Sequence, residues 1–119
     1  MDKVCSHCNL LTIVETSFFM KEAKKLVSEG EKDSLKAYLA ANPEAGDLIS
    51  GLRGIRKLRW QANQKGKRGG ARIIYFFYNL RLPLFLLDIY SKSRKEDLDA
   101  LEKKELNKLT DELLATYGE

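Results

Sequence analysis

The chain has 119 residues, of which 44% are hydrophobic and 32% charged, a composition that suits one globular domain and excludes collagen-like, disulfide-framework and intrinsically disordered classes. Its longest apolar stretches, residues 73–78 and 84–87, are too short for the roughly 18 residues that span a bilayer, so we expect neither a transmembrane protein nor a membrane partner. The net charge of +4 is modest, but the basic residues are unevenly distributed.

Residues 1–9 are predicted to be a flexible extension that precedes a single domain at residues 10–119. They lack the apolar region of a signal peptide, which favours the cytoplasm. They also hold Cys5 and Cys8, the only Cys-x-x-Cys, with the one histidine, His7, between them. A structural zinc site needs four ligands, and a redox motif normally lies where a strand meets a helix in a βαβ unit. We therefore favour a structural or tag-like role, and we expect no metal or other cofactor.

The first half of the domain is predicted to be a strand followed by two helices. Leu10–Glu15 is short, apolar and β-branched, which is typical of a strand. Thr16 or Ser17 then caps a helix whose apolar residues recur at helical spacing until Gly30. A second helix is expected over Lys32–Ala41, joined to the first at Gly30 as in an αα-hairpin. It ends before a proline, because the residue preceding proline avoids helical dihedral angles.

After a predicted loop at Pro43–Gly51, the periodicity changes from helical to alternating. Within Ile55–Ala62, one face carries Arg56, Leu58 and Trp60, and the other carries Lys57, Arg59 and Gln61. Asn63–Gly70 is a glycine-rich basic loop. Arg72–Tyr78 is apolar on both faces and predicts a central strand, and Leu84–Ser91 predicts a third strand with Asp88, Tyr90 and Lys92 sharing a face. Three consecutive strands with short connections favour an antiparallel meander.

A final helix completes the predicted domain. It opens at the capping-box sequence Ser93–Glu96, and its apolar stripe should pack on the sheet. The stripe comprises Leu98, Leu101, Leu106, Leu109, Leu113 and Tyr117. The predicted order is therefore β-α-α-β-β-β-α. This is an α+β domain in which a small antiparallel sheet carries two amino-terminal helices and one carboxy-terminal helix.

A basic segment lies in the middle of the chain. Between Asp47 and Asp88 there is no acidic residue and there are nine basic ones, whereas the remaining 12 bases face all 17 acids. Such segregation predicts a surface that binds a polyanion. The alternative is a solvated basic face without a partner, which the complete absence of acids disfavours because unrelieved like charge destabilises a fold. The nine bases are Arg53, Arg56, Lys57, Arg59, Lys65, Lys67, Arg68, Arg72 and Arg81.

Familiar catalytic arrangements are missing from the sequence. The one histidine lies in the amino-terminal extension, so a Ser-His-Asp or Cys-His arrangement has no credible base. The glycine-rich loop leads into a predicted strand, whereas a Walker sequence leads into a helix. What remains is a set of cations beside aromatic residues, which a meander brings to one rim or face of the sheet. Arginine there contacts phosphate bidentately, and tyrosine stacks on exposed bases.

The tyrosines each have a packing alternative. For Tyr75 and Tyr78 it is burial in the core, which we favour for Tyr78. For Tyr90, contact with a ligand and core packing stay equally open. Arg72 has an alternative too, a structural ion pair with an acid such as Asp88.

A surface of this kind is able to cleave RNA without histidine. RNA carries its own nucleophile, the 2′-hydroxyl, and an enzyme supplies charge stabilisation, alignment and proton transfer. Arginine cannot act as the base because its pKa is above about 12, whereas a lysine crowded by other cations has a lowered pKa and can. The charge pattern alone predicts only binding.

Several motifs resemble one family. Residues 54–59 (GIRKLR) and 65–75 (KGKRGGARIIY), together with 42–49 (NPEAGDLI) and 87–92 (LDIYSK), resemble the HigB-like branch of the RelE/ParE toxin superfamily. The resemblance covers about residues 11–115, and the KGKRGGARIIY block is its most specific part.

The resemblance implies the toxin of a type II toxin–antitoxin pair, a metal-independent endoribonuclease (mRNA interferase) that binds the ribosomal A site and cuts the mRNA there. The implied partners are a helix-turn-helix antitoxin and, through it, operator DNA. The motifs carry over as catalytic residues Arg59, Lys65, Lys67, Arg68, Arg72 and Lys92, and as RNA-binding residues Arg56, Lys57 and Tyr90.

Two other functions remain open within this resemblance. A ParE-like toxin inhibits DNA gyrase by binding and cuts nothing. Such an inhibitor has no need of a cluster that cleaves phosphodiesters, so the dense basic block at residues 65–72 argues against this alternative. A degenerate member binds only RNA or its antitoxin.

Overall fold

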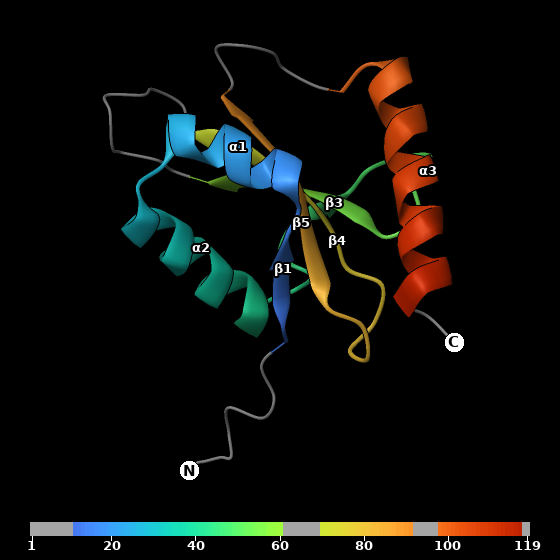
Figure 1. Ribbon diagram of the computed structural model, residues 1–119, viewed down its shortest axis with the longest axis horizontal. Coiled ribbons are helices and arrows are strands. Elements are labelled where there is room, and N and C mark those ends of the chain that lie inside the picture. Colours follow the sequence, from blue (N-terminus) through green and yellow to red (C-terminus); the bar gives the residue numbers. More distant parts are fainter. Residues whose placement is uncertain (1–10, 61–69, 92–97, 118–119) are drawn as a thin grey trace.

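The computed structural model describes residues 11–60, 70–91 and 98–117 (Figure 1). Within these ranges the chain forms three helices and a five-stranded sheet. The predicted extension with Cys5 and Cys8, most of the glycine-rich loop, and the capping-box sequence Ser93–Glu96 lie outside the described residues. In chain order the elements are β1 (Ile13–Glu15), α1 (Ser17–Leu26), α2 (Glu29–Ala41), β2 (Asp47–Leu48), β3 (Ile55–Trp60), β4 (Ala71–Phe76), β5 (Leu84–Ser91) and α3 (Ala100–Tyr117).

The sheet has the strand order β1-β5-β4-β3-β2. Strands β3, β4 and β5 form the predicted antiparallel meander, with β4 in the centre. The expectation of an antiparallel sheet needs one correction, because β1 pairs in parallel with β5 and the sheet is mixed. A second correction is the two-residue strand β2, which lies in the segment predicted to be a loop and pairs with β3. The strand predicted from the β-branched residues at Leu10–Glu15 is observed as β1, whereas β2 has no periodicity of its own and is defined by its partner strand.

The junction between α1 and α2 differs from the prediction. Thr16 caps α1 as expected, since its hydroxyl accepts from Phe19 N at 3.2 Å. Helix α1 ends at Leu26, however, and Gly30 lies inside α2. A capping box starts α2, in which Ser28 Oγ accepts from Glu31 N at 3.1 Å and Glu31 accepts from Ser28 N at 3.2 Å. Because this cap satisfies two otherwise unpaired N–H groups, it offsets the roughly 1 kcal/mol that glycine costs within a helix.

Helix α3 is described from Ala100 onward. Its first turn is closed by Asp99 and Glu102, each of which accepts from the backbone N–H of the other, at 2.8 and 3.0 Å. The predicted capping box at Ser93–Glu96 lies outside the described residues, and a D-x-x-E capping box stands at the start of α3. The predicted stripe also needs correction, because Leu101 is 64% exposed. The side chains that pack toward the sheet include Leu106, Leu109, Leu113 and Leu114.

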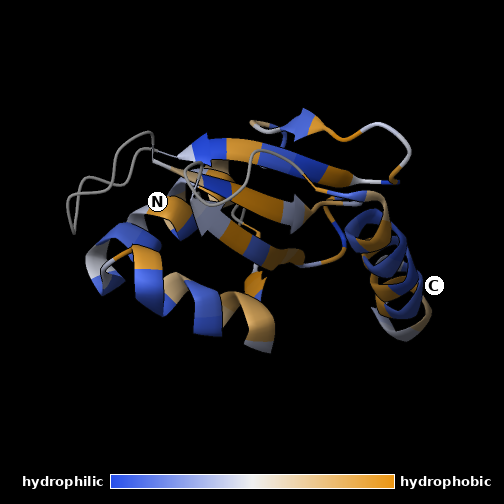
Figure 2. Ribbon diagram, turned by 90° about the horizontal axis from the view of Figure 1, so that it is seen from above, coloured by the Kyte–Doolittle hydropathy of each residue, from blue (hydrophilic) through white to orange (hydrophobic). Residues whose placement is uncertain are grey.

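Two apolar cores lie on opposite faces of the sheet. Helices α1 and α2 cover one face, where Phe19, Leu35 and Leu39 pack on Ile73 and Tyr75 (Figure 1). Helix α3 covers the other face, where its leucines meet a second cluster that includes Ile74, Phe76, Phe85 and Leu87. Hydrophobic and hydrophilic residues are mixed along each helix, as amphipathic covering helices require (Figure 2). All of β4 is buried, which confirms the predicted central strand.

The position of Tyr78 differs from the prediction. Tyr78 was expected in the core but is 48% exposed, because β4 ends at Phe76 and the chain leaves the sheet before Tyr78. Within the described ranges, no helix combines the length and apolar content that crossing a bilayer requires.

An ion-pair cluster joins β1 to α2. The Glu15 carboxylate accepts from Lys36 Nζ at 2.8 Å and lies 3.1 Å from Lys32 Nζ. The Glu15 side chain is only 13% exposed. Burial alone would raise the pKa of this carboxyl, but hydrogen bonds from Lys36 and Lys32 and their positive charge outweigh burial and hold the pKa below its ordinary value. The bonds therefore stabilise the fold where Glu15 is ionised.

We expect Glu15→Gln to lower the free energy of unfolding by about 2 kcal/mol at pH 7, because it removes two charge-assisted bonds. A depressed pKa stabilises the fold above the unfolded-state value and loses this contribution as the pH falls through the folded-state value. The difference between Glu15→Gln and the parent should thus shrink as the pH falls below the ordinary carboxyl pKa, and it should be smaller at about pH 3 than at pH 7. Urea denaturation at both pH values measures it, with Glu29→Gln, 80% exposed, as the matched control. An equal difference at both pH values would contradict the ionic origin.

Candidate functional site

Three of the predicted site residues form a row across the sheet. Arg59 of β3 is the direct cross-strand partner of Arg72 in β4, and Arg72 is in turn the partner of Tyr90 in β5. Lys57 lies two residues before Arg59 and therefore on the same face. This face also carries Ile74 and Phe76 and is the one that α3 covers. We refer to Arg59, Arg72 and Tyr90 as the cationic row.

The side chains of the row differ in how far they are exposed to solvent. Arg59 is exposed and Lys57 is partly exposed, whereas Arg72 is 7% and Tyr90 1% exposed. Arg59 therefore offers the accessible charge, and Arg72 and Tyr90 lie largely beneath the surface. Side chains directly opposite in an antiparallel pair have Cβ atoms about 4.5–5.5 Å apart, and like charges there destabilise the pairing.

The remaining predicted site residues divide into four that lie outside the described residues and one on the opposite face of the sheet. Lys65, Lys67, Arg68 and Lys92 lie outside the described residues. Arg56 is on the opposite face of β3, where its Nη1 donates to the carbonyl of Gly46 at 2.7 Å and to that of Glu44 at 3.2 Å. In the described structure Arg56 therefore holds the turn before β2, apart from the cationic row.

Tyr75 holds the same turn from the core. Its hydroxyl donates to the carbonyl of Pro43 at 2.8 Å and accepts from the backbone N–H of Gly46 at 2.8 Å, and the side chain is fully buried. A Cβ at Gly46 would lie 2.9 Å from both the Lys57 carbonyl and the Tyr75 ring, so only glycine allows this close approach. The turn in turn places Asp47 opposite Lys57 at the edge of the sheet.

This Tyr75–Arg56 clamp was missed by sequence reasoning. Two sequence features together could have indicated it. One is the close spacing of a proline and a glycine in the NPEAGD segment, and the other is a tyrosine inside a strand that is otherwise apolar. Burial raises the pKa of the Tyr75 phenol above its ordinary value, although the hydrogen bond from Gly46 and the charge of Arg56 oppose the rise. The phenol thus stays protonated in the folded protein and keeps its donor for Pro43.

The chemistry of the site rests on fixed cations. No group of His, Cys, Asp and Glu side chains suited to holding a metal ion occurs in the part of the chain that the structure describes. Arg59 and Arg72 lie on adjacent strands, and Tyr90 is at the end of the row. Lys57 lies two residues before Arg59 on the same face. This set defines a small α+β protein whose sheet presents a cationic face.

The comparisons with known proteins place this fold. No protein-family model matches the sequence. The structure is similar to that of an arginine-to-alanine double mutant of the E. coli toxin RelE in its free state, with a TM-score of 0.57 and 17% sequence identity. The match covers 82% of this chain and 97% of the RelE chain. The fold is therefore RelE-like, an α+β arrangement of three helices and a mixed five-stranded sheet over the described residues.

We expect Tyr75→Phe to lower the free energy of unfolding by about 1–3 kcal/mol, because it leaves the Gly46 N–H and the Pro43 carbonyl without their partner. A raised pKa stabilises the fold below the unfolded-state value and loses this contribution as the pH rises, so the penalty should shrink above about pH 10. Denaturant titrations at pH 7 and pH 11 measure both effects. Tyr78→Phe, at an exposed position, is the control and should match the parent at both pH values.

Proposed function

We propose that this chain is the toxin of a type II toxin–antitoxin pair and cleaves mRNA on the ribosome. The observation that carries the proposal is the cationic row, in which Arg59, Arg72 and Tyr90 occupy directly opposed positions on three adjacent strands. The RelE-like fold supports it, because RelE is itself a toxin. A helix-turn-helix antitoxin, the ribosomal A site and, through the antitoxin, operator DNA are the proposed partners.

The proposed reaction uses the nucleophile of the RNA itself. The 2′-oxygen attacks the adjacent phosphorus and loses its proton, and the bond from phosphorus to the 5′-oxygen breaks as that oxygen gains a proton. Negative charge accumulates on the phosphorane oxygens in the transition state, and fixed cations stabilise it more than they stabilise the ground state. No metal is required for this step.

The proposed roles of these residues differ with the exposure of each side chain. Exposed Arg59 and partly exposed Lys57 meet the backbone of the incoming RNA. Arg72, held in the central strand between its two partners, supplies a rigid charge for the phosphorane. Tyr90 borders Arg72 and contributes alignment. Lys65, Lys67, Arg68 and Lys92 complete the proposed catalytic set as sources of further charge and of the base, since a lysine among cations has a lowered pKa.

We expect Arg72→Ala to reduce single-turnover mRNA cleavage on programmed ribosomes by about 10²–10³-fold, the usual loss for one transition-state donor. Arg72→Lys should recover part of the rate, because it keeps the charge and loses the bidentate geometry. Since Arg72 is largely buried, thermal melting and circular dichroism must show that both variants fold.

The matched control for this experiment is Arg53→Ala, an exposed arginine of the same basic segment that precedes β3 and lies outside the row. It should cleave at the parental rate. Parental cleavage by folded Arg72→Ala would remove Arg72 from the catalytic set.

A second prediction concerns salt. We expect ribosome association to weaken steeply as ionic strength rises, because each neutralised phosphate releases condensed counterions, with a slope of about 0.7–0.9 per phosphate. Arg59→Ala should reduce this slope by about one phosphate contact. Affinity measured by sedimentation between 50 and about 200 mM salt tests both points. A flat dependence would mean that the basic segment does not touch RNA.

Two assays separate this function from the others. Inhibition of DNA supercoiling without mRNA cleavage identifies a gyrase inhibitor, and binding without either effect identifies a degenerate module. Primer-extension mapping of mRNA 5′ ends after induction provides the in vivo counterpart.

A further inference from the structure

Two aromatic side chains meet at one corner of the sheet, where the last turn of α2 contacts the end of β3. The rings of Tyr38 in α2 and Trp60 in β3 have their centroids 5.7 Å apart and are tilted by 49°. This separation is usual for an aromatic pair, and the tilt means that the two rings are not stacked on each other. Tyr38 is 41% exposed and Trp60 is partly exposed, so a ligand can reach both rings. We refer to these two residues as the aromatic corner.

Core packing accounts for only one side of this corner. Trp60 and Leu58 pack at the margin of the core beneath α1 and α2. Leu35 and Leu39 of α2 are buried in that core, whereas Tyr38 contacts Trp60 from the surface. Exposed aromatic rings beside a cationic surface are the side chains on which single-stranded nucleic acids stack their bases.

The edge of the sheet is open beside the aromatic corner. β2 pairs only with Arg56 and Lys57 of β3. Over the described ranges, the outer edge of β3 from Leu58 to Trp60 therefore has no strand beside it. Arg59 of the cationic row directly precedes Trp60, and successive side chains of a strand point to opposite faces. A ligand that passes over this edge can thus contact Arg59 on one face and the aromatic corner on the other.

The charge around the aromatic corner suits a phosphodiester chain. Arg59 is exposed, and residues 61–72, which follow Trp60 in the sequence, contain four basic residues and no acidic one. On α2, the positions one helical turn from Tyr38 are the ones that lie next to it, and all four are uncharged. These positions are Ser34, Leu35, Ala41 and Asn42. Phosphates that these bases attract therefore meet no carboxylate at the positions next to Tyr38.

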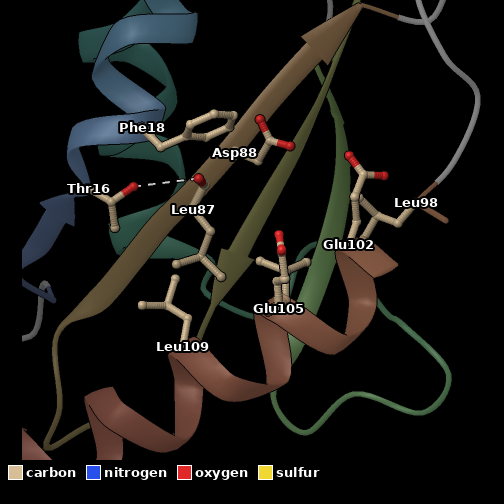
Figure 3. A pocket seen from close by; sticks show the side chains of 9 residues that line it. Thr16, Phe18, Leu87, Asp88, Leu98, Glu102, Glu105 and Leu109 are labelled. Atoms are coloured by element: carbon tan, nitrogen blue, oxygen red, sulfur yellow. Dashed lines mark hydrogen bonds between the residues drawn. The ribbon is translucent and has the colours of Figure 1, made fainter. Parts of the chain in front are cut away.

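The α3 side of the sheet offers no comparable contact. A groove of about 380 Å³ lies there, between the start of α1, β5 and α3 (Figure 3). A β-bulge, at which the pairing of β4 with β5 shifts between Ile74 and Tyr75, places both Leu87 and Asp88 in its wall. Among the described residues that line the groove, Phe18 is the one aromatic residue and none is lysine or arginine. The aromatic corner is therefore the better place for a base beside the cationic row.

We propose that the aromatic corner binds an unpaired nucleobase of RNA, stacked on Tyr38 and Trp60, while the backbone of the same strand contacts Arg59. This inference rests on the proposed function in that both need RNA at the cationic row, but it requires no cleavage. Stacking tolerates any sequence because every base has a π face. The corner therefore positions the strand and does not select a codon.

The one tryptophan of the chain makes this contact measurable, because a base stacked on an indole ring quenches its fluorescence. A labelled single-stranded RNA oligonucleotide is titrated into the full chain. The emission of Trp60 reports contact at the corner, and the anisotropy of the label reports total binding. An abasic oligonucleotide of the same length is the control, since it carries the same phosphates without bases. We expect the RNA to quench Trp60 and to bind at least about tenfold more tightly than the abasic strand, which should not quench.

Substitutions of Tyr38 separate its ring from its hydroxyl. Tyr38→Leu should weaken RNA binding by about tenfold and leave the affinity for the abasic strand unchanged, whereas a general loss of structure would weaken both. Tyr38→Phe keeps the ring and should bind RNA as the parent does. Tyr78→Leu, at a tyrosine that is 48% exposed and lies beyond the end of β4, is the matched control and should change neither readout. Circular dichroism confirms that the three variants fold.

Three results would overturn the proposal. The RNA and the abasic strand bind equally and neither quenches Trp60, which would leave only phosphate contacts. Folded Tyr38→Leu binds RNA as tightly as the parent does, or Tyr38→Phe loses as much affinity as Tyr38→Leu.

The same experiments distinguish this failure from a failure of the proposed function. RNA binding that Arg59→Ala weakens, without quenching of Trp60, would remove the base contact and leave the proposed ribonuclease intact. Quenching of Trp60 by RNA, together with parental mRNA cleavage by folded Arg72→Ala, would support the base contact and contradict the proposed catalytic role of Arg72.

Discussion

The register of β4 between β3 and β5 is the constraint on which the remaining structure depends. β4 is buried along its whole length, and each of its residues has a partner on both neighbouring strands. Ile73 and Tyr75 face α1 and α2, whereas Arg72, Ile74 and Phe76 face α3. A slip of one residue would exchange the two faces and bury the guanidinium of Arg72 in the wrong core. The same pairing that builds both cores therefore also sets the position of Arg72, the cation proposed to act in catalysis.

One face of the sheet thus has two electrostatic regions. The end of the sheet at Arg59 and Arg72 is cationic, and the region toward α3 is apolar with carboxylates at its rim. The bulge at Ile74 marks the change, because beyond it Asp88 joins the α3 side. Opposite charges placed side by side on one face direct a polyanion to one region and exclude it from the other. The proposed RNA surface is therefore confined to the cationic end of this face.

The long elements were predictable from the sequence because their periodicity is strong. The alternation in 55–60 correctly separated Arg56 from Lys57 and Arg59, and the all-apolar 73–76 correctly indicated a central strand. The features of the sheet that the sequence did not predict share one physical origin, since each is defined by a distant partner. Parallel pairing of β1 depends on β5, the strand β2 depends on β3, and the bulge depends on packing across β4 and β5. Gly30 was misassigned because Ser28 and Glu31 formed a stronger local signal. The sequence predicted the members of the cationic row as candidate site residues. It did not predict that they lie opposite one another, because cross-strand pairing depends on the register of the strands.

The clamp at Tyr75 explains why an RNA-binding interpretation of Arg56 and a structural one compete. Arg56 and Lys57 are adjacent in a basic motif, so composition treats them alike, but alternation sends them to opposite faces. On its face Arg56 meets two backbone carbonyls of a turn that Tyr75 also holds. The turn lies next to Lys57 through the pairing of Asp47, so the clamp supports the edge of the cationic face without touching its ligand. This basic motif is therefore divided, with Arg56 stabilising the turn and Lys57 on the opposite face, where the RNA site is proposed. Loss of activity on mutating such a motif has to be assigned residue by residue, with stability measured each time.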